Sequence, residues 1–245
     1  MNRLAILDWG IGGLGFLKEW RLRRPDEGVV YFSDSGFPPY GKVPPDELRE
    51  RLEKVVAWLG REYGVTHCVF ACNAASTVVG EIECGKVEVR GIIEPAAKWL
   101  RENLPPGRVT VTGGVRTIAS GIYERLLPGY EVTGIVGQSL SAMVEAGRLE
   151  GPEVEEAVRE SLGKAGPNLF LACTHYIALR EVFAQVLPGT TLHDPVPGVA
   201  EVFSKKWHTM AGGDLFLTTG SAKEMEGSGW AAFGVGLTAR EAEGV

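Results

Sequence analysis

Two stretches of the chain, CVFACN at residues 68–73 and LFLACTH at residues 169–175, decide how the rest of the sequence is interpreted. Each is an apolar run typical of a buried strand, followed by Ala-Cys, a small polar residue and a segment that can start a helix. A thiol at such a junction is partly exposed and lies near backbone N–H groups that favour the thiolate. One such site suggests a nucleophile. Two equivalent sites, at Cys72 and Cys173, suggest a pair of thiols facing one small substrate from opposite sides.

Strand-like runs alternate with helical patterns on both sides of these stretches, which predicts an α/β fold built on mostly parallel sheets. The runs expected as strands are residues 3–7, 29–33, 66–71, 89–93, 108–112, 131–136, 168–172, 190–193 and 214–218. Apolar residues at helical spacing predict helices from Asp46 to Leu59, from Ile118 to Leu126 and from Val154 to Leu162. Pro95 suits the first position of a further helix that runs toward Asn103.

The two halves of the chain have the same outline. Each opens with a strand and a glycine-rich turn, DWGIGG at residues 8–13 and TGG at residues 112–114, and each later supplies one of the two cysteines. We therefore expect two similar α/β domains related by pseudo-twofold symmetry, with the active site in the cleft between them, because ligands bind beyond the carboxyl ends of parallel strands. The expected N-terminal domain, residues 1–96 plus 204–245, carries Cys72. The expected second domain, residues 97–203, carries Cys173.

Composition narrows the class of protein. The 245 residues carry a formal net charge of −6, so nucleic acid and anionic membranes are not the expected partners. No apolar run approaches the roughly 20 residues of a membrane helix, and no secretory leader precedes the first strand. We expect a cytoplasmic protein whose four cysteines are reduced thiols. Without a CxxC pair or a His-Cys spacing typical of zinc sites, no metal is expected.

A simpler interpretation of each cysteine is a small buried hydrophobe, which is how most free cysteines behave. We assign that role to Cys68, inside its strand, and a loop or surface position to Cys84. For Cys72 and Cys173, the repeated sequence context makes the interpretation as buried hydrophobes much less favoured.

Further motifs occur in a fixed order along the chain. They are DWGIGGL at 8–14, YFSD at 31–34, PYG at 39–41, ACN at 71–73, GIIEP at 91–95, SGIYE at 120–124, VEAG at 144–147, CTHY at 173–176 and TTG at 218–220. In this series the chain resembles the glutamate racemases of the aspartate/glutamate racemase superfamily over nearly its whole length. The resemblance implies racemisation of an amino acid without pyridoxal phosphate or any other cofactor. One cysteine would remove the α-proton as thiolate while the other, as thiol, protonates the opposite face.

The resemblance also implies roles for particular residues. Asp8 would assist Cys72, and His175 with Glu145 would assist Cys173. The substrate-binding positions that match the family pattern are Trp9, Tyr40, Gly41, Asn73, Ala74, Thr117 and Thr174. Without the resemblance, Asp8 could be a turn-capping residue and Glu145 an ordinary exposed carboxylate on a helix.

Three positions depart from that pattern. The family usually has Ser at the position of Trp9 and Thr at the positions of Ala74 and Gly114. Each lost hydroxyl would remove roughly 0.5–1.5 kcal/mol of net interaction with the substrate. The catalytic set is intact while the recognition set is altered.

These patterns favour a racemase that interconverts L- and D-glutamate and supplies D-glutamate for peptidoglycan precursors. One alternative keeps the two-thiol chemistry but acts on another amino acid or acid. Another is a catalytically silent binding relative, which the retained cysteines argue against. The expected partner is a small-molecule amino-acid substrate. The resemblance also allows a homodimer, and no feature of the sequence fixes its interface.

Overall fold

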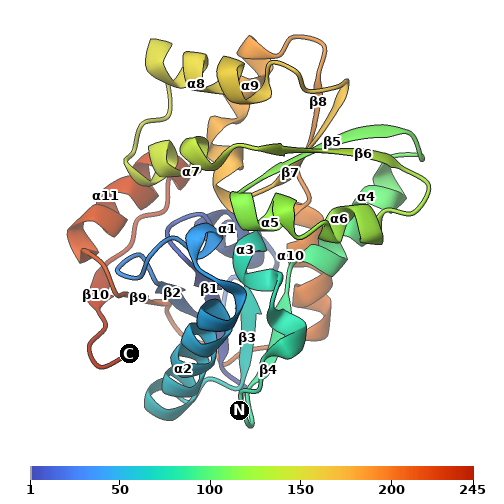
Figure 1. Ribbon diagram of the computed structural model, residues 1–245. Coiled ribbons are helices and arrows are strands. Elements are labelled where there is room, and N and C mark those ends of the chain that lie inside the picture. The colour runs from blue at the N-terminus through green and yellow to red at the C-terminus, as the bar shows by residue number, and fades with distance from the viewer. Residues whose placement is uncertain (1) are drawn as a thin grey trace.

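The computed structural model describes residues 2–245 as two parallel β-sheets with helices packed on both (Figure 1). The first sheet has the strand order β10-β9-β2-β1-β3-β4, and the second has the order β6-β5-β7-β8. The first sheet consists of β1 (Leu4–Asp8), β2 (Val30–Ser33), β3 (His67–Phe70), β4 (Glu88–Gly91), β9 (Leu215–Thr218) and β10 (Ala239–Glu241). The second consists of β5 (Arg108–Gly113), β6 (Glu131–Val136), β7 (Asn168–Ala172) and β8 (Thr191–His193). The predicted fold class is confirmed.

The two sheets repeat one pattern of pairing. The order β2-β1-β3-β4 in the first sheet matches β6-β5-β7-β8 in the second, and neighbouring strands pair in parallel throughout both. The strands that precede the two cysteines, β3 and β7, are therefore equivalent. Strands β9 and β10 bring the C-terminal part of the chain back to the first sheet, while the exact domain boundaries stay a prediction.

The first sheet is covered on both faces because its strands are apolar on both. In β1, Ala5 and Leu7 belong to one core cluster and Leu4 and Ile6 to another, as the two-residue period of a strand requires. The first cluster packs under α2 (Pro45–Tyr63), whose apolar stripe of Leu48, Leu52, Val55, Val56 and Leu59 is fully buried. The second packs under α1 (Leu14–Arg23) and α10 (Val196–Lys206).

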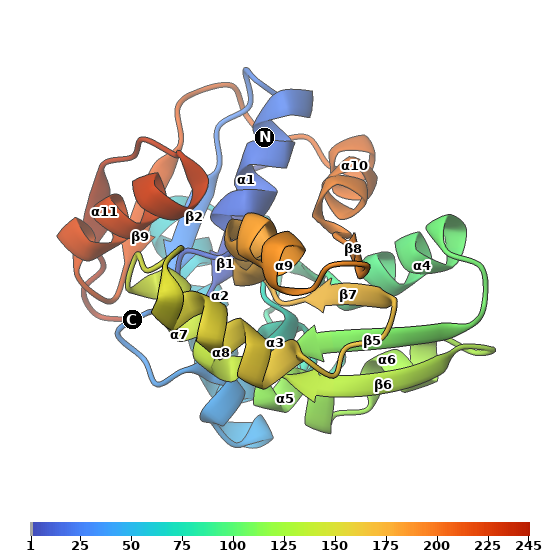
Figure 2. The ribbon, with the colours of Figure 1, turned by 90° about the horizontal axis from the view of Figure 1, so that it is seen from above.

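Shorter helices lie between and around the sheets (Figures 1 and 2). They are α3 (Asn73–Ser76), α4 (Ile93–Asn103), α5 (Val115–Ala119), α6 (Ile122–Leu126), α7 (Gln138–Glu145), α8 (Pro152–Leu162), α9 (Arg180–Val186) and α11 (Ala222–Phe233). Three short 3₁₀ segments complete the set: η1 (Tyr40–Lys42), η2 (Val79–Glu81) and η3 (Thr174–Leu179). Within residues 2–245, no helix combines the length and apolar composition that crossing a membrane requires.

Two of the local predictions were wrong. The expected helix from Ile118 to Leu126 is two short helices, α5 and α6, because Gly121 between them adopts a left-handed conformation with φ of +60°. Pro95 occupies the third position of α4 rather than the first, since that helix already begins at Ile93.

Candidate active site

The carboxyl ends of β1 and β3 face those of β5 and β7 across one cavity of about 50 Å³. Segments from both sheets meet there, with α3 and η1 of the first domain in contact with α5 of the second. The lining residues are Asp8, Trp9, Pro39, Tyr40, Gly41, Cys72, Asn73, Ala74, Gly114, Thr117, Gln138, Ser141, Ala172, Cys173, Thr174 and His175. Of the predicted site residues, all line the cavity except Glu145, which lies behind His175.

The two thiols occupy equivalent backbone positions in the two domains. Cys72 is extended, with φ of −143° and ψ of 122°, and immediately precedes α3. Cys173 has φ of −150° and ψ of 127° and immediately precedes η3. Each strand therefore delivers its cysteine to the cavity just where a helical turn begins. The N–H groups of the next residues in each turn are directed toward the same space.

Asp8, the last residue of β1, is fully buried beside Cys72. Its Oδ1 accepts a hydrogen bond from the Trp9 N–H at 2.7 Å, and its Oδ2 accepts one from the Thr174 hydroxyl of the other domain at 3.0 Å. Burial raises the pKa of Asp8 to about 6, although the charge of His175 and hydrogen bonds from Cys72 and Thr174 oppose the rise. Asp8 is thus a carboxylate at neutral pH that can still take up a proton.

Burial also raises the pKa of the Cys72 thiol well above its ordinary value, and the negative charge of Asp8 adds to this effect. Cys72 is therefore a protonated thiol in the resting protein, next to a carboxylate.

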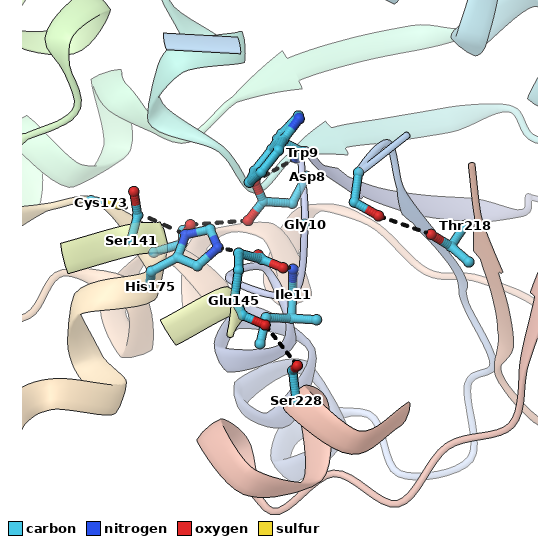
Figure 3. A network of polar contacts seen from close by, with 12 residues as sticks. Asp8, Trp9, Gly10, Ile11, Ser141, Glu145, Cys173, His175, Thr218 and Ser228 are labelled. Atoms are coloured by element: carbon cyan, nitrogen blue, oxygen red, sulfur yellow. Dashed lines mark hydrogen bonds and ion pairs between the residues drawn. The ribbon is translucent and has the colours of Figure 1, made fainter. Parts of the chain in front are cut away.

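Cys173 has the opposite kind of neighbour (Figure 3). His175 Nδ1 lies 3.8 Å from Cys173 Sγ, and His175 Nε2 lies 2.5 Å from Glu145 Oε1, which also accepts the Ile11 N–H at 2.7 Å. Burial lowers the pKa of His175, but hydrogen bonds to Cys173 and Glu145 and the charges of both raise it well above its ordinary value. His175 thus places a cation beside Cys173.

The glycine-rich turn after β1 makes room for the side chains of His175 and Glu145. A Cβ atom at Gly10 would lie 1.8 Å from Glu145 Oε1, and one at Gly12 would lie 2.5 Å from His175 Nδ1. Only glycine allows His175 and Glu145 of the second domain to approach the first so closely.

The predicted substrate-binding residues leave few polar side-chain groups free. The Tyr40 hydroxyl donates to buried Asp34 at 2.7 Å, so Tyr40 presents its ring and backbone rather than its hydroxyl. Asn73 Oδ1 accepts from the Tyr123 hydroxyl at 2.7 Å, which leaves the Asn73 amide N–H groups for a ligand. The Trp9 indole donates to the Phe37 carbonyl at 2.8 Å, and this bond fixes the ring in the cavity wall.

Sequence reasoning missed Gln138 and Ser141, which also line the cavity. Both lie on α7, and Gln138 is two residues beyond the end of β6. The rule that ligands bind beyond the carboxyl ends of parallel strands could have singled them out. Within residues 2–245, no cluster of three or more His, Cys, Asp or Glu side chains is arranged to hold a metal ion.

Comparison with known proteins places this cavity in a family. No family model matches the chain. The chain is 32% identical to the glutamate racemase of Shouchella clausii over 242 residues, which cover 91% of this chain and 87% of that protein. It is 34% identical to the glutamate racemase of Streptococcus equi subsp. equi over 194 residues, covering 75% and 73% of the two. The chain belongs to the glutamate racemase family.

A solved glutamate racemase supports the same assignment through its fold. The Thermus thermophilus protein, in complex with β-chloro-D-alanine, matches with a TM-score of 0.83 and 27% identity over 98% of this chain and 96% of that one. The resemblance drawn from the sequence motifs is confirmed. As a member of the glutamate racemase family, the chain is an isomerase of the racemase class.

Proposed function

We propose that this protein is a cofactor-independent racemase that interconverts L- and D-glutamate, with Cys72 and Cys173 acting on opposite faces of the α-carbon. The observation that carries the proposal is the pair of thiols at equivalent strand-to-helix junctions of two opposed domains, both lining one cavity. Family membership supports the reaction. The complex of the Thermus thermophilus relative supports an amino acid as ligand.

The surroundings of the two thiols suit a two-base reaction. The Cys173 thiolate, held by the His175 imidazolium, would take the α-proton and become a thiol. The Cys72 thiol would then deliver its proton to the opposite face and become a thiolate. In the direction in which Cys72 acts as the base, ionised Asp8, with a pKa near 6, can take up the proton of the Cys72 thiol, so that the thiolate does not face a second negative charge. The reverse direction uses the same groups with their roles exchanged.

An α-proton beside an ionised carboxylate is very weakly acidic, so the cavity must also stabilise the carbanion-like charge. We infer that the Asn73 amide and the backbone N–H groups at the starts of α3 and η3 bind the α-carboxylate. Thr174 and Thr117 adjoin them. The segment Tyr40–Gly41 would meet the side-chain carboxylate. A substrate that fills the cavity would displace its water, which would strengthen each of these interactions.

The expected role is the supply of D-glutamate for peptidoglycan precursors in the cytoplasm. Membership of the family also allows a homodimer.

Proton NMR in deuterium oxide tests the proposal. We expect the α-proton signal of both L- and D-glutamate to disappear when the protein is added, because each turnover exchanges that proton with solvent. Cys72→Ser and Cys173→Ser should each abolish interconversion of the enantiomers. Cys84→Ser, at a half-buried position that does not line the cavity, is the matched control and should react like the unchanged protein. An unchanged signal with folded protein overturns the proposal.

A second candidate is the same chemistry on another substrate. It is favoured by one observation, the absence of hydroxyl groups at Trp9, Ala74 and Gly114 in the cavity wall. Exchange of the α-proton in another amino acid of a panel, with none in glutamate, would establish it.

A further inference from the structure

Among residues 2–245, two amide side chains line the cavity, those of Asn73 and Gln138. The resemblance to the family assigned no role to Gln138. It is the first residue of α7, beyond the end of β6, and so stands where the second sheet presents its carboxyl edge. Its side chain reaches both domains.

The Gln138 carboxamide occupies the space that Gly114 leaves empty. A Cβ atom at Gly114 would lie 2.9 Å from Gln138 Oε1, and one at Gly41 in the other domain would lie 2.7 Å from the same oxygen. A side chain at position 114 and the present conformation of Gln138 therefore exclude each other. The absence of a side chain at Gly114 is therefore what gives the Gln138 carboxamide its place in the cavity wall.

Neighbouring groups fix the orientation of this amide. Gln138 Oε1 accepts from the Val115 N–H at 3.2 Å, and Nε2 donates to the Ser141 hydroxyl at 3.2 Å. The Ser141 hydroxyl in turn donates to the main-chain carbonyl of Gln138 at 2.8 Å. This arrangement uses the oxygen and one of the two N–H bonds of Nε2, so the amide has one donor left for a ligand.

The same part of the wall holds the segment expected to meet the substrate side chain. Arg116 Nε donates to the Tyr40 carbonyl at 3.0 Å across the domains, and beside it a Cβ atom at Gly41 would lie 2.7 Å from Gln138 Oε1 and 3.9 Å from Nε2. The free donor of Gln138, on Nε2, therefore lies close to the side-chain end of the cavity, next to the oxygen that faces Gly41. A carboxylate there would accept a charge-assisted hydrogen bond, which is stronger than a bond between neutral groups.

We propose that Gln138 is a specificity-determining residue that binds the distal carboxylate of an α-amino dicarboxylic acid, in place of a hydroxyl group at position 114. This inference rests on the proposed function. Gln138 contacts the part of the substrate that does not react. Its removal should therefore weaken the ground state and the transition state alike, which raises KM and leaves kcat nearly unchanged.

Kinetics of four variants test this role. We expect Gln138→Ala to raise KM for glutamate about tenfold with kcat within about twofold. Gln138→Glu keeps the shape but places a carboxylate against the substrate carboxylate, so KM should rise further. Gly114→Thr alone should lower kcat/KM because its side chain collides with Gln138. Combining Gly114→Thr with Gln138→Ala should restore much of that loss.

Gln185→Ala, at the exposed second glutamine of the chain on α9, is the matched control and should change neither constant. Calorimetric titration of glutamate into wild type and Gln138→Ala separates binding from turnover. If the wild type binds glutamate but does not exchange its α-proton, the proposed function is wrong. Weaker glutamate binding by Gln138→Ala would in that case still support the role of Gln138. An unchanged KM and Kd in folded Gln138→Ala, or a double variant no better than Gly114→Thr, overturns the inference. Wild type that neither binds nor exchanges glutamate overturns both.

Discussion

Asp8 and His175 give the two thiols surroundings of opposite charge. Cys72 stands beside a buried carboxylate, and Cys173 stands beside an imidazolium paired with Glu145. The backbone is nearly symmetric at these positions while the side chains are not. The proposed two-base reaction starts each turnover with one thiol and one thiolate, and the two thiols accordingly have neighbours of opposite charge.

Asp8→Asn measures the cost of burying that carboxylate. Burial raises the pKa of Asp8 from 3.8 to about 6, so the unfolded chain loses this proton at lower pH than the native protein. Stability should therefore fall as pH rises from about 4 to about 6. We expect Asp8→Asn to raise the free energy of unfolding by about 1–3 kcal/mol at neutral pH and to have little effect below about pH 4, measured by urea denaturation. Equal changes at both pH values would contradict this.

The same titration should appear in the kinetics. Asp8 must be ionised to accept a proton from Cys72, so kcat/KM of the wild type should fall as pH drops through about 6. The measurement is the pH profile of α-proton exchange. In Asp8→Asn the residual activity should be low and should lack this step.

Glu145→Gln tests the partner of His175. The pKa of His175 is raised, so the pairing stabilises the folded protein fully below about pH 6.5 and is lost as pH rises through the raised native value. We expect Glu145→Gln to lower the free energy of unfolding by about 2–4 kcal/mol near pH 6, because it leaves a buried cation without its partner. The loss should be smaller in strongly alkaline solution.

The control for this experiment is Glu153→Gln. Glu153 pairs with Arg148 at 2.6 Å on the surface, and its side chain is 65% exposed. Exposed pairs contribute little, so this change should stay within about 0.5 kcal/mol at either pH. A similar loss in both variants would show that the effect is not specific to His175.

Among the elements of the fold, the turn between β1 and α1 is the one most tightly built into the site. A methyl group at Gly12 would lie 2.5 Å from His175 Nδ1 and 2.6 Å from Thr174 Oγ1. Gly12→Ala should therefore displace both side chains. We expect α-proton exchange to fall at least about tenfold and the free energy of unfolding to fall by about 1–3 kcal/mol, by analogy with overpacked cores.

Gly227→Ala is the control that distinguishes the collision expected at Gly12 from the general effect of replacing a glycine with alanine. Gly227 lies within α11, and a Cβ atom there would meet no atom within 4 Å. Alanine is the better helix former, so thermal unfolding should show a gain of about 0.5–1 kcal/mol with activity unchanged. A gain at Gly12 as well would contradict the packing argument.

At the scale of the whole molecule, the cavity is lined by residues that follow strands of both sheets. A bound substrate would therefore connect the two domains. We expect saturating D-glutamate to slow backbone hydrogen exchange in residues 73–76 of α3 and in residues 174–179 of η3, because ligand binding to the native state suppresses local opening. Residues 152–162 of α8, outside the cavity, are the internal control. Protection in only one of the two segments would contradict a ligand held between the domains.

The sequence by itself determined the features that depend on local pattern. All nine predicted strands are present, with ends that differ by up to two residues, and the central ones were readable because they are apolar runs bounded by turn residues. The two Ala-Cys junctions and the apolar stripe of α2 were also readable, since neighbours along the chain define them. Strand β10 was missed because three residues with exposed charges carry no such pattern.

Only the tertiary structure decided how residues distant in sequence meet. The bond from Thr174 to Asp8, the place of Glu145 behind His175, and the shared space of Gln138, Gly114 and Gly41 all join segments from different strands or domains. Such contacts form where the carboxyl ends of the two sheets face each other, and no local propensity encodes them. The sequence named the chemical groups of the site, whereas the fold fixed their neighbours, their charges and the space left for a substrate.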